Sequence, residues 1–314
     1  MTAKEKYEGS RIMKTLFAAL CVAACVWGQE GTGPFPAVLE QDPSLPTHTV
    51  YRPKDLSQLK GQKLPIIAWG NGACVNNGLS HRNFLMEIAS YGYLAIAIGP
   101  PQATPAAGQG KQGPAAAAKG DAKQAAPAGP ATKSSELLDA INWAIAQNSQ
   151  KGSMYQGKLD PAKIAVMGMS CGGIQALAVA TDPRIKLVGI WNSGILNMPQ
   201  GAGAPAMEDV RKDQLEKLHS PIFYVNGDKT DIAYENGLDD YNRITKVPAI
   251  RLSRDGVGHG GTYSQPNGGE FAKVAVAMLK WQFHGDKEAA KMFVGENCGF
   301  CQDPKWHVST KGIK

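Results

Sequence analysis

A serine between two glycines is the first residue of this sequence that could do chemistry. Gly168-Met169-Ser170-Cys171-Gly172 fits the pattern G-x-S-x-G, whose small glycines allow a strained turn to present a serine hydroxyl. The apolar segment 164–167 comes before it, and residues 172–180 after it have the composition of a helix. Because strand, turn and helix follow one another as this pattern requires, we predict that Ser170 is a nucleophile and not merely a helix cap.

A serine hydroxyl is a weak nucleophile at neutral pH, so Ser170 needs a base. Six histidines are available: His48, His81, His219, His259, His284 and His307. Only His259 lies in a glycine-rich loop, residues 255–261, directly after a late apolar segment. We therefore predict that His259 is the base, and His81, in the first turn of an expected helix, is the alternative.

The base in turn needs an acid that orients it. Asp228 and Asp231 both follow the apolar segment 221–225. Asp231 ends the turn, whereas Asp228 lies beside Lys229 nearer the tip, so we favour Asp231. The chain order Ser170, Asp231, His259 is the order of the α/β-hydrolase triad, which predicts a serine hydrolase.

Two loops should donate hydrogen bonds to the oxyanion that such a reaction forms. One donor is the backbone N–H of Cys171, the residue after Ser170. The other should come from residues 70–74, where Ala73 or Cys74 is the expected donor. Cys74 and Cys171 would then lie on the same small site, which predicts a disulfide between them; two separate buried thiols are the alternative.

Residues 1–28 are typical of an export signal. Four basic residues lie within positions 1–14, and the 12 residues 16–27 are uncharged. A bilayer-spanning helix needs about 20 apolar residues, so this length favours a signal peptide cleaved before Gln29. We expect a secreted or periplasmic protein, with a lipid anchor on Cys25 as the alternative. No later segment has the length and apolarity of a transmembrane helix.

If the protein is exported, its four cysteines outside the signal segment should be oxidised. In an oxidising compartment an even number of cysteines indicates disulfides, and the CxxC pair Cys298 and Cys301 most simply closes on itself. Cys298, Cys301 and His307 could instead bind zinc, but a fourth ligand is missing. We therefore predict no metal and no cofactor.

The composition is that of a folded domain. Hydrophobic residues make up 43% and charged residues 19% of the chain, which excludes a disordered protein and a coiled coil. The net charge of +6 falls to +4 without residues 1–28, and no dense basic stripe is present, so nucleic-acid binding is not expected. We expect one domain and a monomer.

Apolar segments alternate with helix-compatible segments along the chain. The expected strands are 47–52, at a sheet edge, 64–69, 93–98, 164–167, 187–191, 221–225 and 248–252. The expected helices are 80–91, which Ser80 could cap, 134–145, 172–180, 234–244 and 271–283. This alternation predicts an α/β fold, with a mostly parallel sheet and helices on both faces. The domain should span residues 29–293, and residues 294–314 should form a tail that carries the CxxC.

Residues 101–133 interrupt this pattern. They include 12 Ala, 5 Gly and 5 Pro, and no large aliphatic or aromatic residue. Such a segment cannot bury a core of its own, so we expect a surface insertion.

Residues 47–293 resemble secreted α/β-hydrolases of the dienelactone-hydrolase, chlorophyllase and cutinase-like polyester-hydrolase group. The resemblance rests on these segments: Trp69-Gly70-Asn71-Gly72, the G-x-S-x-G motif, Gly227 through Asp231-Ile232-Ala233, Gly258-His259-Gly260 and Trp191-Asn192-Ser193. It implies the α/β-hydrolase fold and a Ser170–His259–Asp231 triad, and it places Trp191 at the border of the substrate cleft. Asn71 and Met169 are the other expected substrate-binding residues. Dienelactone hydrolases differ in using a cysteine nucleophile.

The leading expectation is a carboxylic-ester hydrolase that acts on a small or polymeric ester. An amidase or peptidase with the same three residues is the first alternative. A binding protein on a hydrolase scaffold is the second, and occupied nucleophile, base and acid positions disfavour it.

Overall fold

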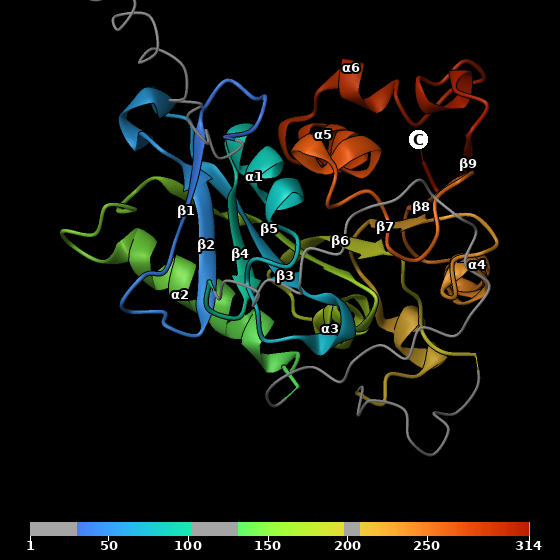
Figure 1. The fold of residues 1–314 in the computed structure, drawn as a ribbon, viewed down its shortest axis with the longest axis horizontal. Helices are drawn as coiled ribbons and strands as arrows, with labels where there is room; N and C mark the ends of the chain where they lie inside the picture. The colour runs from blue at the N-terminus through green and yellow to red at the C-terminus, as the bar shows by residue number, and fades with distance from the viewer. Residues whose placement is uncertain (1–29, 102–130, 198–207, 314) are drawn as a thin grey trace, which may run out of the picture.

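One nine-stranded sheet forms the centre of the molecule (Figure 1). The computed structural model describes residues 30–101, 131–197 and 208–313, so the predicted signal segment lies outside the described residues. The strands are β1 (Ala37–Glu40), β2 (His48–Pro53), β3 (Leu64–Gly70), β4 (Leu94–Ile98), β5 (Leu159–Met169), β6 (Ile185–Trp191), β7 (Ile222–Asn226), β8 (Ala249–Arg254) and β9 (Trp306–Lys311).

The sheet is mostly parallel. Its strand order is β1-β2-β4-β3-β5-β6-β7-β8-β9, and every pair from β4 to β8 is parallel. Antiparallel strands form both edges: β1 and β2 at one end and β9 at the other. Three of the central strands, β3, β4 and β7, are buried along their whole length because both faces of the sheet are covered.

Helices cover both faces of the sheet (Figure 1). They are α1 (Arg82–Ser90), α2 (Ser135–Ser149), α3 (Cys171–Val179), α4 (Tyr234–Arg243), α5 (Gly269–His284) and α6 (Lys287–Ala290). Apolar side chains of α2 and α3 pack into one core with the sheet, and those of α1 and α5 pack into a second core on the opposite face. The predicted α/β architecture of one domain is thus confirmed, with helices on two faces of one sheet.

The two outermost strands were not expected. The predicted edge strand 47–52 corresponds to β2, but β1 pairs on its outer side, so β2 is not an edge. The expected tail also differs, because β9 extends the sheet and Phe300 and Trp306 are buried against the α5 side. Neither strand has a continuous buried apolar run: only Ala37 of β1 and Trp306 of β9 are buried. Helix α1 begins at Arg82, with His81 and not Ser80 at its N-cap position.

The end of the predicted insertion is part of the packed structure. Residues 102–130 lie outside the described residues, but Thr132 is buried and its N–H and hydroxyl both donate to the carbonyl oxygen of Cys74. Gln175 on α3 donates from Nε2 to the carbonyl and hydroxyl oxygens of Thr132. The composition of the segment gave no sign of this anchor, so the expected surface insertion extends too far at its C-terminal end.

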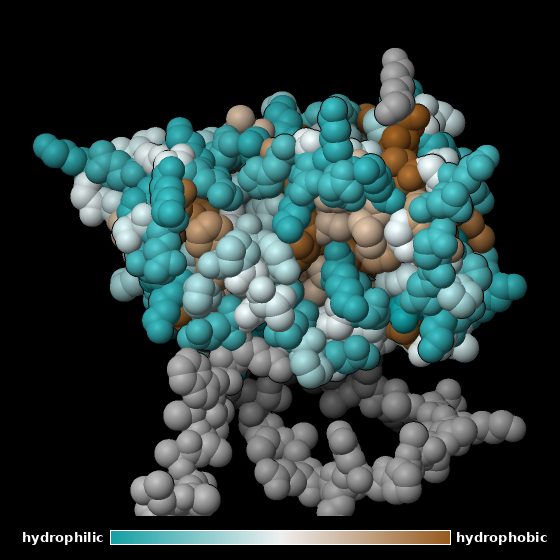
Figure 2. Space-filling view, turned by 90° about the horizontal axis from the view of Figure 1, so that it is seen from above, coloured by the Kyte–Doolittle hydropathy of each residue, from teal (hydrophilic) through white to brown (hydrophobic). Residues whose placement is uncertain are grey.

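The face that carries α1, α5 and α6 is largely hydrophilic, with small apolar areas between charged side chains (Figure 2). Among the described residues, no helix combines the length and apolarity that a bilayer crossing requires. Met154 and Ile232 are the only large hydrophobic side chains of the described part that are strongly exposed.

Replacing residues 102–130 by a short Gly/Ser linker should change Tm by only a few degrees, because that segment has no large apolar side chain to bury. Thermal unfolding followed by circular dichroism measures this. A replacement that also removes Thr132 should lower Tm further, because it removes the buried hydrogen bonds to Cys74 and Gln175. A loss of about 10 °C or more with the shorter replacement would show that the segment packs on the domain.

Candidate active site

Five loops leave the sheet at the carboxyl ends of β3, β5, β6, β7 and β8 and meet above that edge. The strand register brings them together: Gly70 pairs with Gly168, Met169 with Trp191, and Asn226 with Ser253. Ligands of open α/β sheets bind at this edge. It is here that Ser170, Asp231 and His259, from three different loops, come together.

Ser170 occupies a sharp turn between β5 and α3. Its φ of 53° and ψ of −118° form a backbone conformation that a non-glycine residue adopts only under constraint. Its backbone N–H donates to the Trp191 carbonyl oxygen at 2.9 Å, and Ser193 Oγ donates to its carbonyl oxygen at 2.7 Å. The turn also needs glycine at 172, because a Cβ there would overlap the backbone of Gly70. The Ser170 turn is therefore held by the segment after β6 and by the end of β3.

A chain of hydrogen bonds joins the three predicted residues. Ser170 Oγ lies 2.9 Å from His259 Nε2, and His259 Nδ1 lies 2.7 Å from Asp231 Oδ1. The Asp231 side chain is fully buried, whereas the His259 side chain is 18% exposed and Ser170 is partly exposed. The chain therefore runs from a buried carboxylate to a hydroxyl that solvent can reach.

Asp231 is held as a carboxylate. Burial would raise its pKa, but hydrogen bonds from His259 Nδ1, Ala233 N, Asn192 Nδ2 and Gly227 N outweigh burial and keep the pKa below its ordinary value. An ionised carboxylate only accepts hydrogen bonds, so Nδ1 of His259 carries the proton. In the neutral imidazole, Nε2 is then the acceptor and Ser170 Oγ–H donates to it.

Asp228, the acid that the sequence favoured less, has a different place. Its carboxylate accepts hydrogen bonds from Thr230 N, Thr230 Oγ1 and Gly256 N. It thus closes the turn that precedes Asp231 and ties that turn to the loop after β8.

The loop after β3 lies beside the Ser170 turn and contains two strained residues. Ala73 and Cys74 have φ of 51° and 50° within the short 3₁₀ turn Gly72–Cys74. Cys171 is the first residue of α3, and N–H groups in the first turn of a helix have no partner within the helix. An N–H at this position points toward a ligand at the helix N-terminus. Cys171 N and a second donor from Ala73 or Cys74 remain the predicted oxyanion donors.

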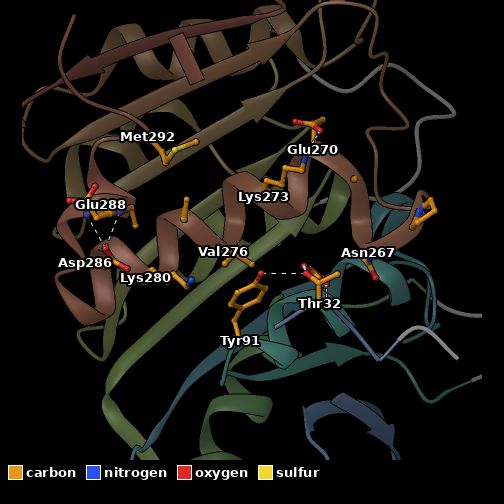
Figure 3. A pocket seen from close by; sticks show the side chains of 15 residues that line it. Thr32, Tyr91, Asn267, Glu270, Lys273, Val276, Lys280, Asp286, Glu288 and Met292 are labelled. Atoms are coloured by element: carbon orange, nitrogen blue, oxygen red, sulfur yellow. Dashed lines mark hydrogen bonds and ion pairs between the residues drawn. The ribbon is translucent and has the colours of Figure 1, made fainter. Parts of the chain in front are cut away.

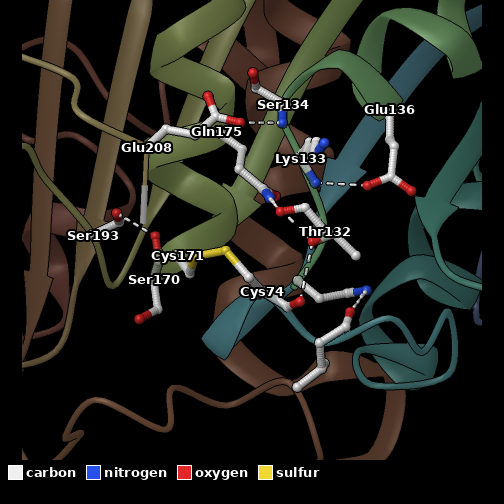
Figure 4. The surroundings of a disulfide bond; sticks show 12 residues. Cys74, Thr132, Lys133, Ser134, Glu136, Ser170, Cys171, Gln175, Ser193 and Glu208 are labelled. Carbon is white, nitrogen blue, oxygen red and sulfur yellow. Dashed lines mark hydrogen bonds between the residues drawn. A yellow bond between two sulfur atoms is a disulfide. The ribbon is translucent and has the colours of Figure 1, made fainter. Parts of the chain in front are cut away.

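The predicted Cys74–Cys171 pair is joined, with the Cα atoms 5.3 Å apart. Figure 4 shows the disulfide directly beside Ser170, with Thr132 on the Cys74 side and Gln175 on α3. A covalent bond and the Thr132–Gln175 hydrogen bonds therefore connect the strained loop to the helix that follows the nucleophile position.

The residues expected to bind substrate are mostly buried. Trp191 is inaccessible to solvent, and its ring packs against Phe84 and Phe271 in the core beneath the site. Asn71 is also inaccessible: its Nδ2 donates to three backbone carbonyl oxygens, of which Ile98 O is the nearest at 2.7 Å, and thereby shapes the loop. Met169 is 8% exposed. The resemblance placed Trp191 at the substrate, and Asn71 was a further expected substrate-binding residue; among the described residues both side chains pack in supporting positions.

His81, the alternative base, is not hydrogen-bonded to Ser170. Its ring is buried between Trp69 and Tyr263, and Trp69 Nε1 donates to its Nδ1 at 3.3 Å. Burial lowers the pKa of His81 to about 3, so the imidazole is neutral at physiological pH.

The C-terminal cysteines form the second disulfide, Cys298–Cys301. His307, the third ligand of the zinc alternative, lies 3.0 Å from Asp255 through Nε2. Within the described ranges no group of three or more His, Cys, Asp or Glu side chains is placed to hold a metal ion.

Two residues next to Asp231 were not predicted. Asn192 follows β6 with φ of 40°, and its Nδ2 donates to Asp231 Oδ2 at 2.8 Å. Tyr263, four residues after His259, donates from Oη to Asn192 Oδ1 at 2.6 Å. The segment Trp191-Asn192-Ser193 was noted only for its tryptophan, and nothing in the sequence linked Tyr263 to it.

A separate groove of about 620 Å³ lies between α1, α5 and α6. Figure 3 shows Tyr91 and Thr32 on one wall and Lys273, Lys280 and Met292 along the other. None of the three hydrogen-bonded residues lines it. Its polar groups pair with each other, as Lys273 does with Glu270, so it has no evident chemistry.

Comparison with known protein families and with curated protein sequences gives no match to this chain. Interpretation of the site therefore depends on the geometry described above.

Changing Cys74 to Ser should lower the stability of the protein, because it opens a cross-link between residues 97 positions apart. Chain-entropy arguments give about 4–5 kcal/mol as the upper bound for such a link. Thermal or urea unfolding measures the effect. Cys298→Ser is the matched control and should have a much smaller effect, because its partner is three residues away. Peptide mapping without reduction that linked Cys74 to Cys298 or Cys301 would contradict the pairing.

Proposed function

We propose that this protein is a serine hydrolase of the α/β-hydrolase fold that cleaves carboxylic esters outside the cytoplasm. The hydrogen-bond chain from Ser170 through His259 to Asp231 carries the proposal. The three residues follow the chain order of the α/β-hydrolase triad and lie at the carboxyl edge of a mostly parallel sheet. The strained strand-to-helix turn at Ser170 is the feature that is called a nucleophile elbow.

In the proposed reaction Ser170 Oγ attacks the ester carbonyl carbon while His259 Nε2 takes its proton. The developing imidazolium is stabilised by the Asp231 carboxylate, which stays ionised. His259 then gives the proton to the leaving alcohol oxygen, and an acyl-enzyme remains on Ser170. Water, deprotonated by the same imidazole, releases the acid and restores the serine.

Electrostatic stabilisation of the oxyanion falls to backbone N–H groups. Cys171 N lies at the start of α3, where the helix dipole favours negative charge. The loop with Ala73 and Cys74 supplies the second donor, and the disulfide fixes that loop relative to α3. Preorganised donors of this kind need no rearrangement as charge develops.

The same machinery would cleave amides, because the choice between ester and amide depends on contacts with the leaving group. An amidase with the same three residues is therefore the second candidate.

A panel of p-nitrophenyl esters of increasing acyl length, beside an aryl amide, tests the proposal. Wild type should release nitrophenol faster than Ser170→Ala, and a fluorophosphonate probe should label wild type only. Equal, slow turnover by both proteins with every substrate would exclude a Ser170-dependent hydrolase.

Ser170→Ala and His259→Ala should each lower kcat by about 10³-fold or more, and the double variant should be scarcely worse, because the residues act as one unit. Asp231→Asn should also be severe, since an uncharged amide with a single acceptor oxygen cannot accept from His259 Nδ1 and also from the donors that now reach Oδ2. Asp228→Asn is the matched control and should be mild, because within the described part of the chain its carboxylate accepts hydrogen bonds from Thr230 and Gly256 and none from His259. A greater loss at Asp228 would move the acid to that position.

Reduction of the disulfide should lower kcat more than it changes KM. Loss of one well-placed oxyanion donor costs about 10²–10³-fold in kcat, and this sets the upper limit for a loop that becomes loose. Kinetics of Cys74→Ser, and of wild type in dithiothreitol, measure the effect. Unchanged kcat after complete reduction would show that the disulfide does not hold the donors.

A further inference from the structure

We propose that Asn192 and Tyr263 are positioning residues that orient the Asp231 carboxylate for its hydrogen bond to His259. The inference rests on the proposed function. It concerns two buried side chains that do not themselves reach Ser170 in any described hydrogen bond.

The contacts form one continuous line. Tyr263 Oη donates to Asn192 Oδ1 at 2.6 Å, and Asn192 Nδ2 donates to Asp231 Oδ2 at 2.8 Å. Asp231 Oδ1 then accepts from His259 Nδ1 at 2.7 Å. Tyr263 and Asp231 are 4% and 2% exposed and Asn192 is inaccessible, so water competes little with these bonds.

Tyr263 reinforces the direction in which the Asn192 amide faces, which Asp231 and the Gly258 carbonyl oxygen also favour because both accept from Nδ2. An amide has a donor end and an acceptor end, and the ionised Asp231 can only accept. The Tyr263 hydroxyl is neutral, because burial and the nearby Asp231 charge raise its pKa well above the ordinary value. Its proton goes to the amide oxygen and keeps the NH₂ end on the carboxylate. Without the hydroxyl, the reversed amide would place an oxygen against Asp231.

The line also closes a ring that joins the loops after β6, β7 and β8. His259 and Tyr263 belong to the same loop after β8, so that loop contacts Asp231 twice: directly from His259 and indirectly through Asn192. The direct bond holds Oδ1 and the indirect bond holds Oδ2, which opposes rotation of the carboxylate. Gly227 N also donates to Oδ2 at 3.0 Å, so loss of the line should weaken the orientation without abolishing it.

The left-handed backbone at 192 offers a simpler reason for an asparagine there, because Asn tolerates this conformation better than most residues. Glycine tolerates it as well. Asn192→Gly therefore removes the amide and keeps the turn, which separates the two explanations.

Tyr263→Phe and Asn192→Gly test the proposal in the full-length protein with a p-nitrophenyl ester. Misplacing a catalytic group by about 1 Å can cost 10²-fold, so we expect a fall in kcat of about 10-fold for each variant, with KM changed less than about twofold. Phenylalanine at 263 keeps the ring contacts with His81, Phe84 and Phe271. Folding should therefore survive.

Tyr224→Phe is the matched control. Tyr224 is also buried and its hydroxyl also donates to a carboxylate, Asp240, at 3.2 Å, but on the opposite face of the sheet. It should lower Tm about as much as Tyr263→Phe and leave kcat unchanged. An equal loss of kcat in the control would overturn the proposal, because general loosening would then explain the effect.

A double-variant cycle gives the decisive outcome. If Tyr263 acts through Asn192, the variant with both changes has the kcat of Asn192→Gly alone, whereas independent effects would multiply to about 100-fold. Multiplied losses, or full kcat in either single variant, overturn the positioning role. The proposed function is judged separately by the ratio of wild type to Ser170→Ala, so the two ideas can fail independently.

Discussion

The buried carboxylate of Asp231 is the interaction on which the site depends. It accepts hydrogen bonds from residues after β6, β7 and β8 and from its own turn, so one charge joins three loops. A carboxylate in this position costs desolvation energy unless its lone pairs are occupied. The four donors keep it ionised, the ionised form places the proton on His259 Nδ1, and that tautomer leaves Nε2 to accept from Ser170.

The strained turns on the Ser170 side of the site are also constrained by contacts from several neighbouring segments. Ser170, Ala73 and Cys74 all have positive φ, and each such residue costs about 1–3 kcal/mol. Close backbone approach at Gly172, the Cys74–Cys171 disulfide and the Thr132 hydrogen bonds act on these turns together. The sheet edge supports both halves of the site, because the Ser170 turn follows β5 and the loop with Ala73 and Cys74 follows the neighbouring strand β3.

Strands and turns that have a regular apolar or glycine pattern could be predicted from the sequence. Edge strands and side-chain contacts that depend on three-dimensional packing could not. Apolar segments such as 64–69 and 221–225 located the parallel strands, and glycines located the turns at Ser170 and His259. The short edge strands β1 and β9 carry no such signal, because an edge needs only half of its side chains buried. Trp191 was placed at the substrate by resemblance and Asn71 was a further expected substrate-binding residue, yet burial gives both a supporting position. Asn192 and Tyr263 meet only in three dimensions, 71 residues apart.

The Cys74–Cys171 disulfide links the structure of the site to the redox state of the compartment. The positive φ of Cys74 is unfavourable in itself. Besides the disulfide on its side chain, Cys74 is held by hydrogen bonds from Thr132 N and Oγ1 to its carbonyl oxygen. A disulfide between these positions persists only where the surroundings are oxidising. If the chain is exported as its first 28 residues predict, the oxyanion loop would be fixed to α3 only after export. The same bond that stabilises the fold would then also complete the proposed site, which would be least well organised before export.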